Sequence, residues 1–336
     1  MPQLSLVLVL LACTGCGFGD HVRVTISPNG SSADDSHGQT VTVDNGSVTL
    51  NGKSITLPKN ATINVNDDDI TIDGKAVSEM GPAIKPSGTP QEEDRKVSEI
   101  RGIEIGPEFD LHYRTGPNSQ VKVTAAPNIL PHIRTTMDGT TLRVTVDANI
   151  DIDGKTSVEI VSPHLETLAL SGNSVAKCEG LNETTVSVEV SGNSMAELFG
   201  KADVIETTIS GDSKLALTDF KAGAIHGELS GASTIGQTGS VGDTNLEVSG
   251  ASTAHLGQIS AGRARFELSG GSNVTASGSA DRIDVTCSGA SSAELSKLQA
   301  KNGNAEAEGA SSAQVNVTGD LTQDSSGASS INNVHS

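Results

Sequence analysis

The feature that most limits the fold of this chain is a short Ser-Gly signature that recurs nine times at an almost constant spacing. The signature is Ser-Gly-x-Ser in eight copies, and one copy has Glu308 in place of the first serine. Successive glycines are 18 to 20 residues apart. A period of this length indicates a repeat architecture in which each unit packs on its neighbours. The turn glycines are Gly172, Gly192, Gly211, Gly231, Gly250, Gly270, Gly289, Gly309 and Gly327.

Apolar and polar residues alternate on both sides of each turn glycine. Two residues before the glycine stand Leu170, Val190, Ile209, Leu229, Val248 and Leu268, and four residues after it stand Ala176, Ala196, Leu215, Ile235, Ala254 and Val274. A period of two is typical of β-strands. Each unit therefore contains a strand, a glycine turn and a second strand, and a further short segment lies near a second glycine such as Gly180 or Gly200.

A unit of about 20 residues with three short strands cannot bury its inner face alone, whereas stacked coils can. We therefore predict an all-β chain in which residues 97–336 form a right-handed parallel β-helix of about nine coils of 19–20 residues, with the Ser-Gly repeats over 165–331. A leucine-rich repeat has a similar period, but its L-x-x-L-x-L-x-x-N framework is absent from the sequence. The serine two residues after each turn glycine is expected to bond to neighbouring backbone along the stack.

The same geometry decides the state of two cysteines. Cys178 lies in the first coil and Cys287 in the seventh, so about six strand spacings, or roughly 29 Å, separate them. A disulfide needs Cα atoms within about 7 Å of each other. The two cysteines are therefore predicted to be unpaired, inward-facing and small apolar fillers of the core.

Composition excludes some partners. The chain has 22 Lys and Arg against 41 Asp and Glu, a net charge of −19, so no nucleic-acid partner is expected because little would neutralise a run of phosphates. Aromatic residues make up 2% of the chain, Trp is absent and Tyr113 is the single tyrosine. This leaves little from which to build a platform that stacks sugars, bases or flavins.

The N-terminus predicts export. Residues 4–12 form an apolar run that is too short to span a bilayer and is typical of the central region of a secretory signal. The segment LLACTGC resembles a bacterial lipobox, although MPQLS contains no Lys or Arg. We predict a signal peptide over residues 1–16, with Cys16 as the lipid anchor and Cys13 as the alternative. The membrane is then a partner through this anchor, and the protein lies in the cell envelope; a plain secretory signal would also place it outside the cytoplasm.

Two further regions precede the repeats. Residues 20–77 alternate apolar and polar residues around Asn-Gly and Asp-Gly turns, which predicts a small β-hairpin region. Its Asp67-Asp68-Asp69 triplet lacks the glycine and distal glutamate of a calcium loop, so we interpret it as a solvated turn. Proline, glycine and charged residues concentrate in residues 78–96, which predicts a linker.

Acidic residues recur three positions before the turn glycine, and we name this set the glutamate stripe. Adjacent coils place its carboxylates about 5 Å apart on an outward face, where they could attract calcium or another ligand. A solvated stripe that keeps the sheet soluble is the simpler interpretation. Catalysis would require basic side chains that converge on the stripe, and Arg263, Arg265 and Arg282 are the nearest in sequence. The stripe consists of Glu189, Glu228, Glu247, Glu267 and Glu306, interrupted by Thr208 and Thr286.

The Ser-Gly-Ala-Ser copies at 230–233, 249–252 and 288–291 resemble the GIN domain, a family of autotransporter adhesin heads. The segments IRGIEIGPEFDLHYRTG (100–116) and VEIVSPHLETLALSGNS (158–174) are similar to the entry strands of the same family. The resemblance covers residues 97–336. It implies an exported, often lipid-anchored β-helix protein, and it brings no catalytic motif and no cofactor.

We therefore expect a non-enzymatic cell-envelope protein that acts as an adhesin or as a surface-binding or structural β-helix module. A cell-surface glycan or a protein is its expected ligand. Two alternatives stay open. One is a carbohydrate-active β-helix enzyme, a polysaccharide lyase or hydrolase, and the other is an envelope assembly scaffold in which an open coil end pairs with another chain.

Overall fold

The computed structural model describes residues 84–147, 150 and 156–335, together with the backbone of eight short strands between residues 21 and 76. In these eight strands all pairs are antiparallel, as in hairpins. One sheet contains β2 (Ser31–Asp34), β3 (Thr40–Asp44), β4 (Ser47–Leu50) and β5 (Lys53–Thr56). The other contains β1 (His21–Val22), β6 (Ile63–Asn66), β7 (Asp69–Ile72) and β8 (Lys75–Ala76).

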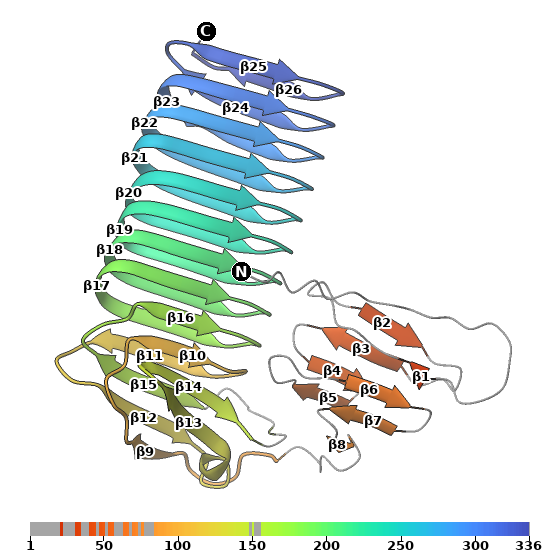
Figure 1. Cartoon of the computed structure of the whole chain (residues 1–336), viewed down its shortest axis with the longest axis vertical. Coiled ribbons are helices and arrows are strands. Elements are labelled where there is room, and N and C mark those ends of the chain that lie inside the picture. The colour runs from red at the N-terminus through yellow and green to blue at the C-terminus, as the bar shows by residue number, and fades with distance from the viewer. Residues whose placement is uncertain are drawn as a thin grey trace, which may run out of the picture.

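The Ser-Gly repeats form a parallel β-helix, as predicted, whose coils stack from β16 to β26 (Figure 1). Seven long strands, β17 to β23, each run from one Ser-Gly turn to the next and make a full coil. Equivalent residues of successive coils pair, so that Thr234 pairs with Thr253 and Thr253 with Asn273. The strands are β16 (Thr167–Leu170), β17 (Val175–Val190), β18 (Met195–Ile209), β19 (Lys214–Leu229), β20 (Thr234–Val248), β21 (Thr253–Leu268), β22 (Asn273–Cys287), β23 (Ser292–Ala307), β24 (Ser312–Val317), β25 (Leu321–Ser325) and β26 (Ser330–Asn333).

All nine turn glycines adopt φ between +71° and +79°, a conformation that side chains rarely adopt. They also stack directly on one another. A Cβ on Gly250 would lie 2.5 Å from the carbonyl oxygen of Gly231 in the preceding coil. Positive φ and close backbone approach therefore both require glycine at this turn.

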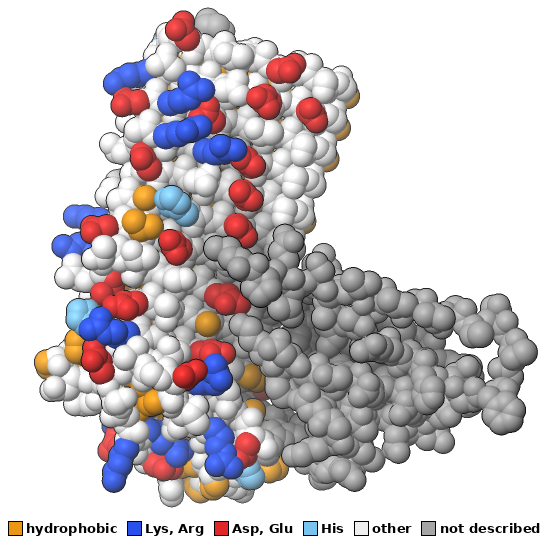
Figure 2. Space-filling model, in the orientation of Figure 1, with side chains coloured by type: hydrophobic (Ala, Val, Ile, Leu, Met, Phe, Trp, Pro, Cys, Tyr) orange, Lys and Arg blue, Asp and Glu red, His pale blue; other side chains and the backbone are white. Residues whose placement is uncertain are grey.

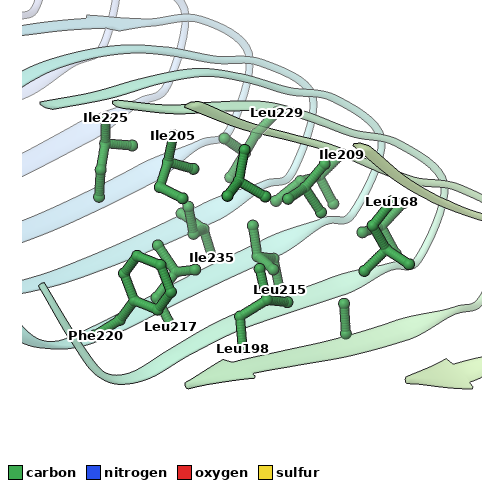
Figure 3. Close-up of a cluster of buried hydrophobic side chains, with 14 of the residues drawn as sticks. Leu168, Leu198, Ile205, Ile209, Leu215, Leu217, Phe220, Ile225, Leu229 and Ile235 are labelled. Atoms are coloured by element: carbon green, nitrogen blue, oxygen red, sulfur yellow. The ribbon is translucent and has the colours of Figure 1, made fainter. Parts of the chain in front are cut away.

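The core lies between the strand segments on the two sides of the turn, whose inward side chains face each other (Figure 3). Leu198, Leu215 and Leu217 follow a turn, Ile209 and Leu229 precede one, and each is at most 1% exposed. Cys178 and Cys287 are also buried in this core and unpaired, as predicted. Burial raises the pKa of the Cys178 thiol to about 12, so the thiol stays neutral and acts as a core side chain.

The serine two residues after each turn glycine faces inward, and it satisfies backbone groups as expected. The Ser233 hydroxyl donates to the carbonyl oxygen of Ser230 at 2.7 Å. The backbone N–H of Ser233 donates in turn to the Ser252 hydroxyl oxygen in the next coil at 3.3 Å. Eight of these serines, from Ser174 to Ser311, are at most 2% exposed. Their role is therefore to close the turn edge of the core.

From Gly172 to Gly309 the coils alternate between 20 and 19 residues, and the difference lies at the second bend, opposite the Ser-Gly turn. Coils of 20 residues carry a large buried side chain at this bend, and coils of 19 residues carry a glycine that pairs with it. The Cβ that each glycine lacks would lie 2.1–2.4 Å from the carbonyl oxygen of the bulky residue in the coil before. The structural repeat is therefore a pair of coils. The bulky residues are Leu181, Phe220, Ile259 and Leu298, and the glycines are Gly200, Gly239 and Gly278.

The first coil is covered by strands that depart from the repeat. The first coil stacks on β10 and β11, which pair with β16 and β17. On their other side β10 and β11 pair with β14 and β15, and these carry the antiparallel partners β13 and β12. The only helix among the described residues is the short 3-10 helix η2 (Leu130–His132), and none of the described helices is long and apolar enough to cross a membrane. The strands are β10 (Gly102–Ile105), β11 (Asp110–Thr115), β12 (Gln120–Ala125), β13 (Ile133–Asp138), β14 (Thr141–Val146) and β15 (Ser157–Ser162).

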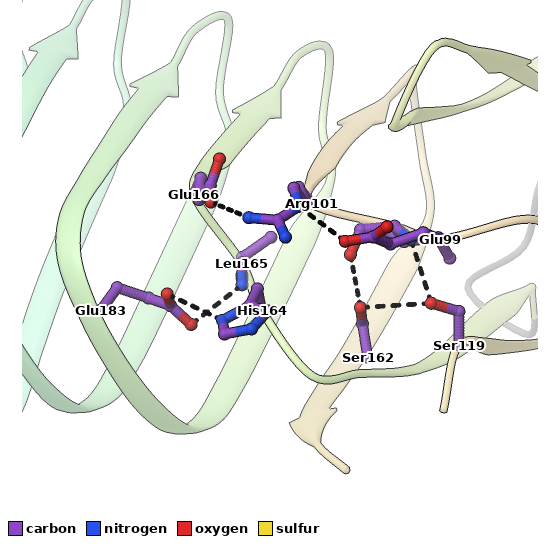
Figure 4. Close-up of polar contacts among 9 residues, drawn as sticks. Glu99, Arg101, Ser119, Ser162, His164, Leu165, Glu166 and Glu183 are labelled. Carbon is purple, nitrogen blue, oxygen red and sulfur yellow. Dashed lines mark hydrogen bonds and ion pairs between the residues drawn. The ribbon is translucent and has the colours of Figure 1, made fainter. Parts of the chain in front are cut away.

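Polar contacts hold the segments that precede β10 and follow β15 (Figure 4). Arg101 donates to Glu99 at 2.7 Å and to Glu166 at 2.6 Å, and these carboxylates raise the pKa of its guanidinium. The Glu183 carboxylate, in β17, faces His164 at 3.2 Å and accepts from the backbone N–H of Leu165 at 3.3 Å. The connection between β15 and β16 is thereby held on the second bend of the first full coil.

The segment expected to be a linker ends in a strand. β9 (Gln91–Arg95) pairs antiparallel with β12, and its sequence Gln-Glu-Glu-Asp-Arg is mostly exposed. The pairing uses backbone groups and the exposed Lys122–Glu92 ion pair, and neither leaves an apolar pattern in the sequence. Charged side chains on such an edge strand discourage pairing with another chain.

Candidate functional site

The glutamate stripe lies at one register position of the β-helix. Glu189 is aligned through Thr208 with Glu228, which pairs with Glu247, and Glu247 pairs with Glu267. Thr286 then separates Glu267 from Glu306. All five glutamates point outward, and Glu267 is half-buried while the other four are exposed. The outward row of carboxylates is thus a direct consequence of the repeat spacing.

A shallow groove of about 310 Å³ follows the middle of the stripe. Glu228, Glu247 and Glu267 form one side. The serines that precede the turn glycines, Ser230, Ser249 and Ser269, form the other. Ser249 directs its hydroxyl to the carbonyl oxygen of Leu229 at 3.1 Å, so part of this serine row is bound to backbone.

The three arginines bind carboxylates on this face, but only one reaches the stripe. Arg265 forms an ion pair with Glu267, with Nε 2.6 Å from Oε1. Arg263 and Arg282 instead bind Asp284, at 2.7 and 2.8 Å. Burial alone would raise the pKa of Asp284, but the hydrogen bonds from these two arginines lower it. A catalytic stripe would need basic side chains that converge on its glutamates. Of the three arginines, Arg265 alone does so, through its ion pair with Glu267.

The alternative interpretation of the stripe, calcium binding, finds no cluster to support it. Among residues 84–147, 150 and 156–335, no group of three or more His, Cys, Asp or Glu side chains is arranged to hold a metal ion. The stripe carboxylates lie in a line along the stack of coils, so they do not surround a common centre. Asp67 and Asp68 of the acidic triplet, as well as Cys13 and Cys16, lie outside the described residues.

A second hollow, of about 450 Å³, lies over the second bend near the first coils. Lys201 and Lys221 line it side by side, because they pair across β18 and β19. Asn182, Glu183 and Asp203 complete its rim. No motif pointed to this hollow, since it depends on the register of the bend.

We use the term upper coils for the coils around the turn glycines from Gly231 to Gly327. The two broad faces of the upper coils differ in chemistry. The charged face consists of the outward positions three and five residues before the turn glycine. Acidic and basic side chains gather on it in Figure 2. Seven of its twelve positions from His226 to Asp324 carry a formal charge. These positions are His226, Glu228, Asn245, Glu247, Arg265, Glu267, Asp284, Thr286, Asn304, Glu306, Thr322 and Asp324.

The opposite face, which we name the hydroxyl–amide face, consists of the outward positions three and five residues after the turn glycine. Glu294 is its single carboxylate, and most of the other positions are Ser, Thr, Asn or Gln. The sequence analysis did not identify this face, because it considered charged side chains. The pattern that indicates the face is a Ser, Thr or Asn three residues after each turn glycine, beginning with Thr234. The positions are Thr234, Gly236, Thr253, His255, Asn273, Thr275, Ser292, Glu294, Ser312, Gln314, Ser330 and Asn332.

These features define a parallel β-helix protein with flat, register-matched outward faces. The family described as "Putative auto-transporter adhesin, head GIN domain" matches residues 100–240 and 228–335, and the chain belongs to this family. The resemblance inferred from the Ser-Gly-Ala-Ser copies is thereby confirmed. No curated protein sequence matches the chain.

Two crystal structures share the fold. A "putative adhesin" from Parabacteroides merdae is 15% identical, with a TM-score of 0.57, and the similarity covers 74% of this chain and 100% of that one. A second "putative adhesin", from Parabacteroides distasonis, is 18% identical with a TM-score of 0.53, over 73% and 100% of the two chains. At these identities the similarity is one of fold.

Proposed function

We propose that this chain is a non-enzymatic binding module of the cell envelope, an adhesin that meets its ligand with the broad outward faces of the β-helix. The observation that carries the proposal is that outward side chains repeat at fixed register over many coils on a closed, fully packed core. Such a preorganised surface loses little conformational freedom when an extended partner lies across it. Membership of the adhesin-head family supports the same role.

The arrangement of the glutamates favours binding over bond cleavage. A polysaccharide hydrolase places two carboxyl groups on opposite sides of the scissile bond. Here the carboxylates follow one another along a single flat sheet, and Arg265 is occupied by Glu267. Arg263 and Arg282 share Asp284. These contacts are those of a solvated, ion-paired surface.

An assembly scaffold is also less well supported. At the last coil the Asn333 side chain accepts from the backbone N–H of Val317 at 2.9 Å and donates to its carbonyl oxygen at 3.0 Å. It thereby occupies backbone groups that a further strand would pair with. This contact favours a capped coil over one that is open for strand addition.

The binding proposal predicts that labelled full-length protein binds intact envelope preparations saturably. Binding should survive high salt, because salt weakens contacts between exposed charges but leaves hydrogen bonding to short side chains in place. Fluorescence or interferometry at increasing protein concentration measures it, with and without calcium. Polysaccharides incubated with the protein serve as the enzymatic control and should show no new reducing ends or unsaturated products. Absence of saturable binding under every condition would contradict the proposal.

We further propose that the module is exported and held in the envelope by a lipid on Cys16. A Cys16→Ala variant should move from the membrane fraction to the soluble fraction, because it loses the thiol that carries the lipid. Cys13→Ala is the matched control and should stay with the membrane. If only Cys13→Ala releases the protein, the anchor is Cys13; if neither does, the lipid anchor is wrong.

A further inference from the structure

The two broad faces of the upper coils rest on the same strands but present different chemistry. On β22, Thr275 belongs to the hydroxyl–amide face and Thr286 to the charged face. Seven of the twelve charged-face positions carry a formal charge, against Glu294 alone on the hydroxyl–amide face. In a chain of net charge −19, this leaves one broad surface that neither attracts nor repels ions strongly. Its partner should therefore be uncharged.

The side chains of the hydroxyl–amide face suit hydrogen bonding. Ser, Thr, Asn and Gln each offer a donor and an acceptor. Serine, threonine and asparagine are also short, so fixing them against a ligand loses less rotamer entropy than fixing lysine or glutamate. Most positions are half-buried between their neighbours in adjacent coils. The hydroxyls of Ser292 and Ser312 lie 3.2 Å apart, which shows how closely the polar groups of successive coils follow each other.

The same face lacks what a protein partner would need. Protein interfaces depend on buried aromatic, aliphatic or arginine anchors. Among the described residues the exposed large hydrophobic side chains are Val175, Met195 and Val334. Val175 and Met195 occupy the same register in the lower coils, and Lys214 separates them from Thr234, where the hydroxyl–amide face begins. A ligand rich in hydroxyl groups matches the surface better than an apolar or a charged one.

We propose that the hydroxyl–amide face binds an uncharged polysaccharide laid across successive coils; this proposal rests on the binding role proposed above. A hydroxyl or amide side chain recurs three residues after the turn glycine in each of these coils, about 4.8 Å apart, so a polymer of repeating sugars can meet a hydrogen-bonding group at every coil. Tyr113 is buried, so no tyrosine is available for stacking. Each sugar is then held by hydrogen bonds alone, and affinity comes from the number of repeated contacts.

The test compares the same substitution on the two faces of one strand. Three full-length proteins are compared: the wild type, Thr275→Arg and Thr286→Arg. Their binding is measured by affinity electrophoresis and pull-down on four uncharged polymers, dextran, mannan, xyloglucan and cellulose. Polygalacturonate and heparin serve as acidic polymers. We expect at least one uncharged polymer to retain the wild type in high salt. Thr275→Arg should weaken this binding about tenfold or more, since it removes a hydrogen-bonding side chain and covers its neighbours. Thr286→Arg should bind within about twofold of the wild type.

A second, more conservative variant tests the face in case Thr275→Arg fails to fold. Thr253→Val keeps the branched shape that suits a strand but removes the hydroxyl, so it should fold normally and bind several-fold more weakly. Free monosaccharide should fail to compete, because it cannot make repeated contacts. Loss of binding in Thr286→Arg alone, or retention only by acidic polymers, would overturn the face assignment while leaving the binding role intact. Failure to bind any envelope preparation or polymer would overturn both.

Discussion

Replacing Gly250 with alanine is expected to lower the free energy of unfolding by at least about 2 kcal/mol. The residue has φ of +71°, where an L side chain costs about 1–2 kcal/mol. Its new Cβ would also meet the carbonyl oxygen of Gly231 at 2.5 Å. That oxygen accepts a hydrogen bond from the N–H of Ala251 at 2.7 Å, so relieving the contact by moving the backbone weakens the link between two coils. Urea denaturation followed by circular dichroism measures the loss.

Two other glycines separate the causes of this effect. Gly139 has φ of +61° with nothing within 4 Å of the absent Cβ, so Gly139→Ala reports conformational strain alone. Gly236 has neither a positive φ nor a neighbour within 4 Å, so Gly236→Ala should change stability by less than about 0.5 kcal/mol. The expected order of destabilisation is Gly250, then Gly139, then Gly236. Equal effects at Gly250 and Gly236 would show that the turn does not require glycine.

Truncating Phe220 to alanine is expected to cost about 3–5 kcal/mol of stability, the range found for buried phenylalanine. The ring is 1% exposed and fills the second bend of a 20-residue coil (Figure 3). The adjacent coil contributes Gly239 at this point and has no side chain that could fill the space. The cavity therefore has little means of collapsing. Thermal and urea unfolding of the purified variant measure the change.

Phe199→Ala is the matched control for the Phe220 substitution. Phe199 is half-buried beside the second bend of a 19-residue coil, where the Lys177 ammonium lies 5.2 Å from its ring centre. A contact of this kind contributes about 0.5–1 kcal/mol, so Phe199→Ala should cost far less than Phe220→Ala. Comparable losses from the two truncations would mean that the bulky bend residues do not support the stack.

The regular part of the fold could be predicted from the sequence because each coil repeats the same local rules. The spacing of the turn glycines sets the strand register, and the register alone places Glu228 beside Glu247 and separates Cys178 from Cys287. The outward position of the glutamate stripe follows from alternation within each strand. These conclusions need only the period of two and the length of the coil.

The remaining features depend on contacts between unlike segments. The pairing of β9 with β12 uses backbone groups, which leave no apolar pattern in Gln-Glu-Glu-Asp-Arg. The preference of Arg263 for Asp284 over the stripe depends on which neighbouring carboxylate lies nearest on the sheet surface. The hydroxyl–amide face has few charged side chains and no aromatic side chain other than His255. A search for charged or aromatic residues therefore does not identify it.

The alternation of bulky and glycine bends has a consequence for how the length of such a protein can change. From Leu181 to Gly278 each bulky bend residue is followed by a glycine in the next coil, so gaining or losing one of these coils would stack two bulky bends or two glycines. A pair of coils, such as the 39 residues from Gly211 to Gly250, can be duplicated or removed while the order of bends stays the same. The distance that the rod reaches outward from its first coil should therefore be inherited in steps of two strand spacings, about 10 Å at a time.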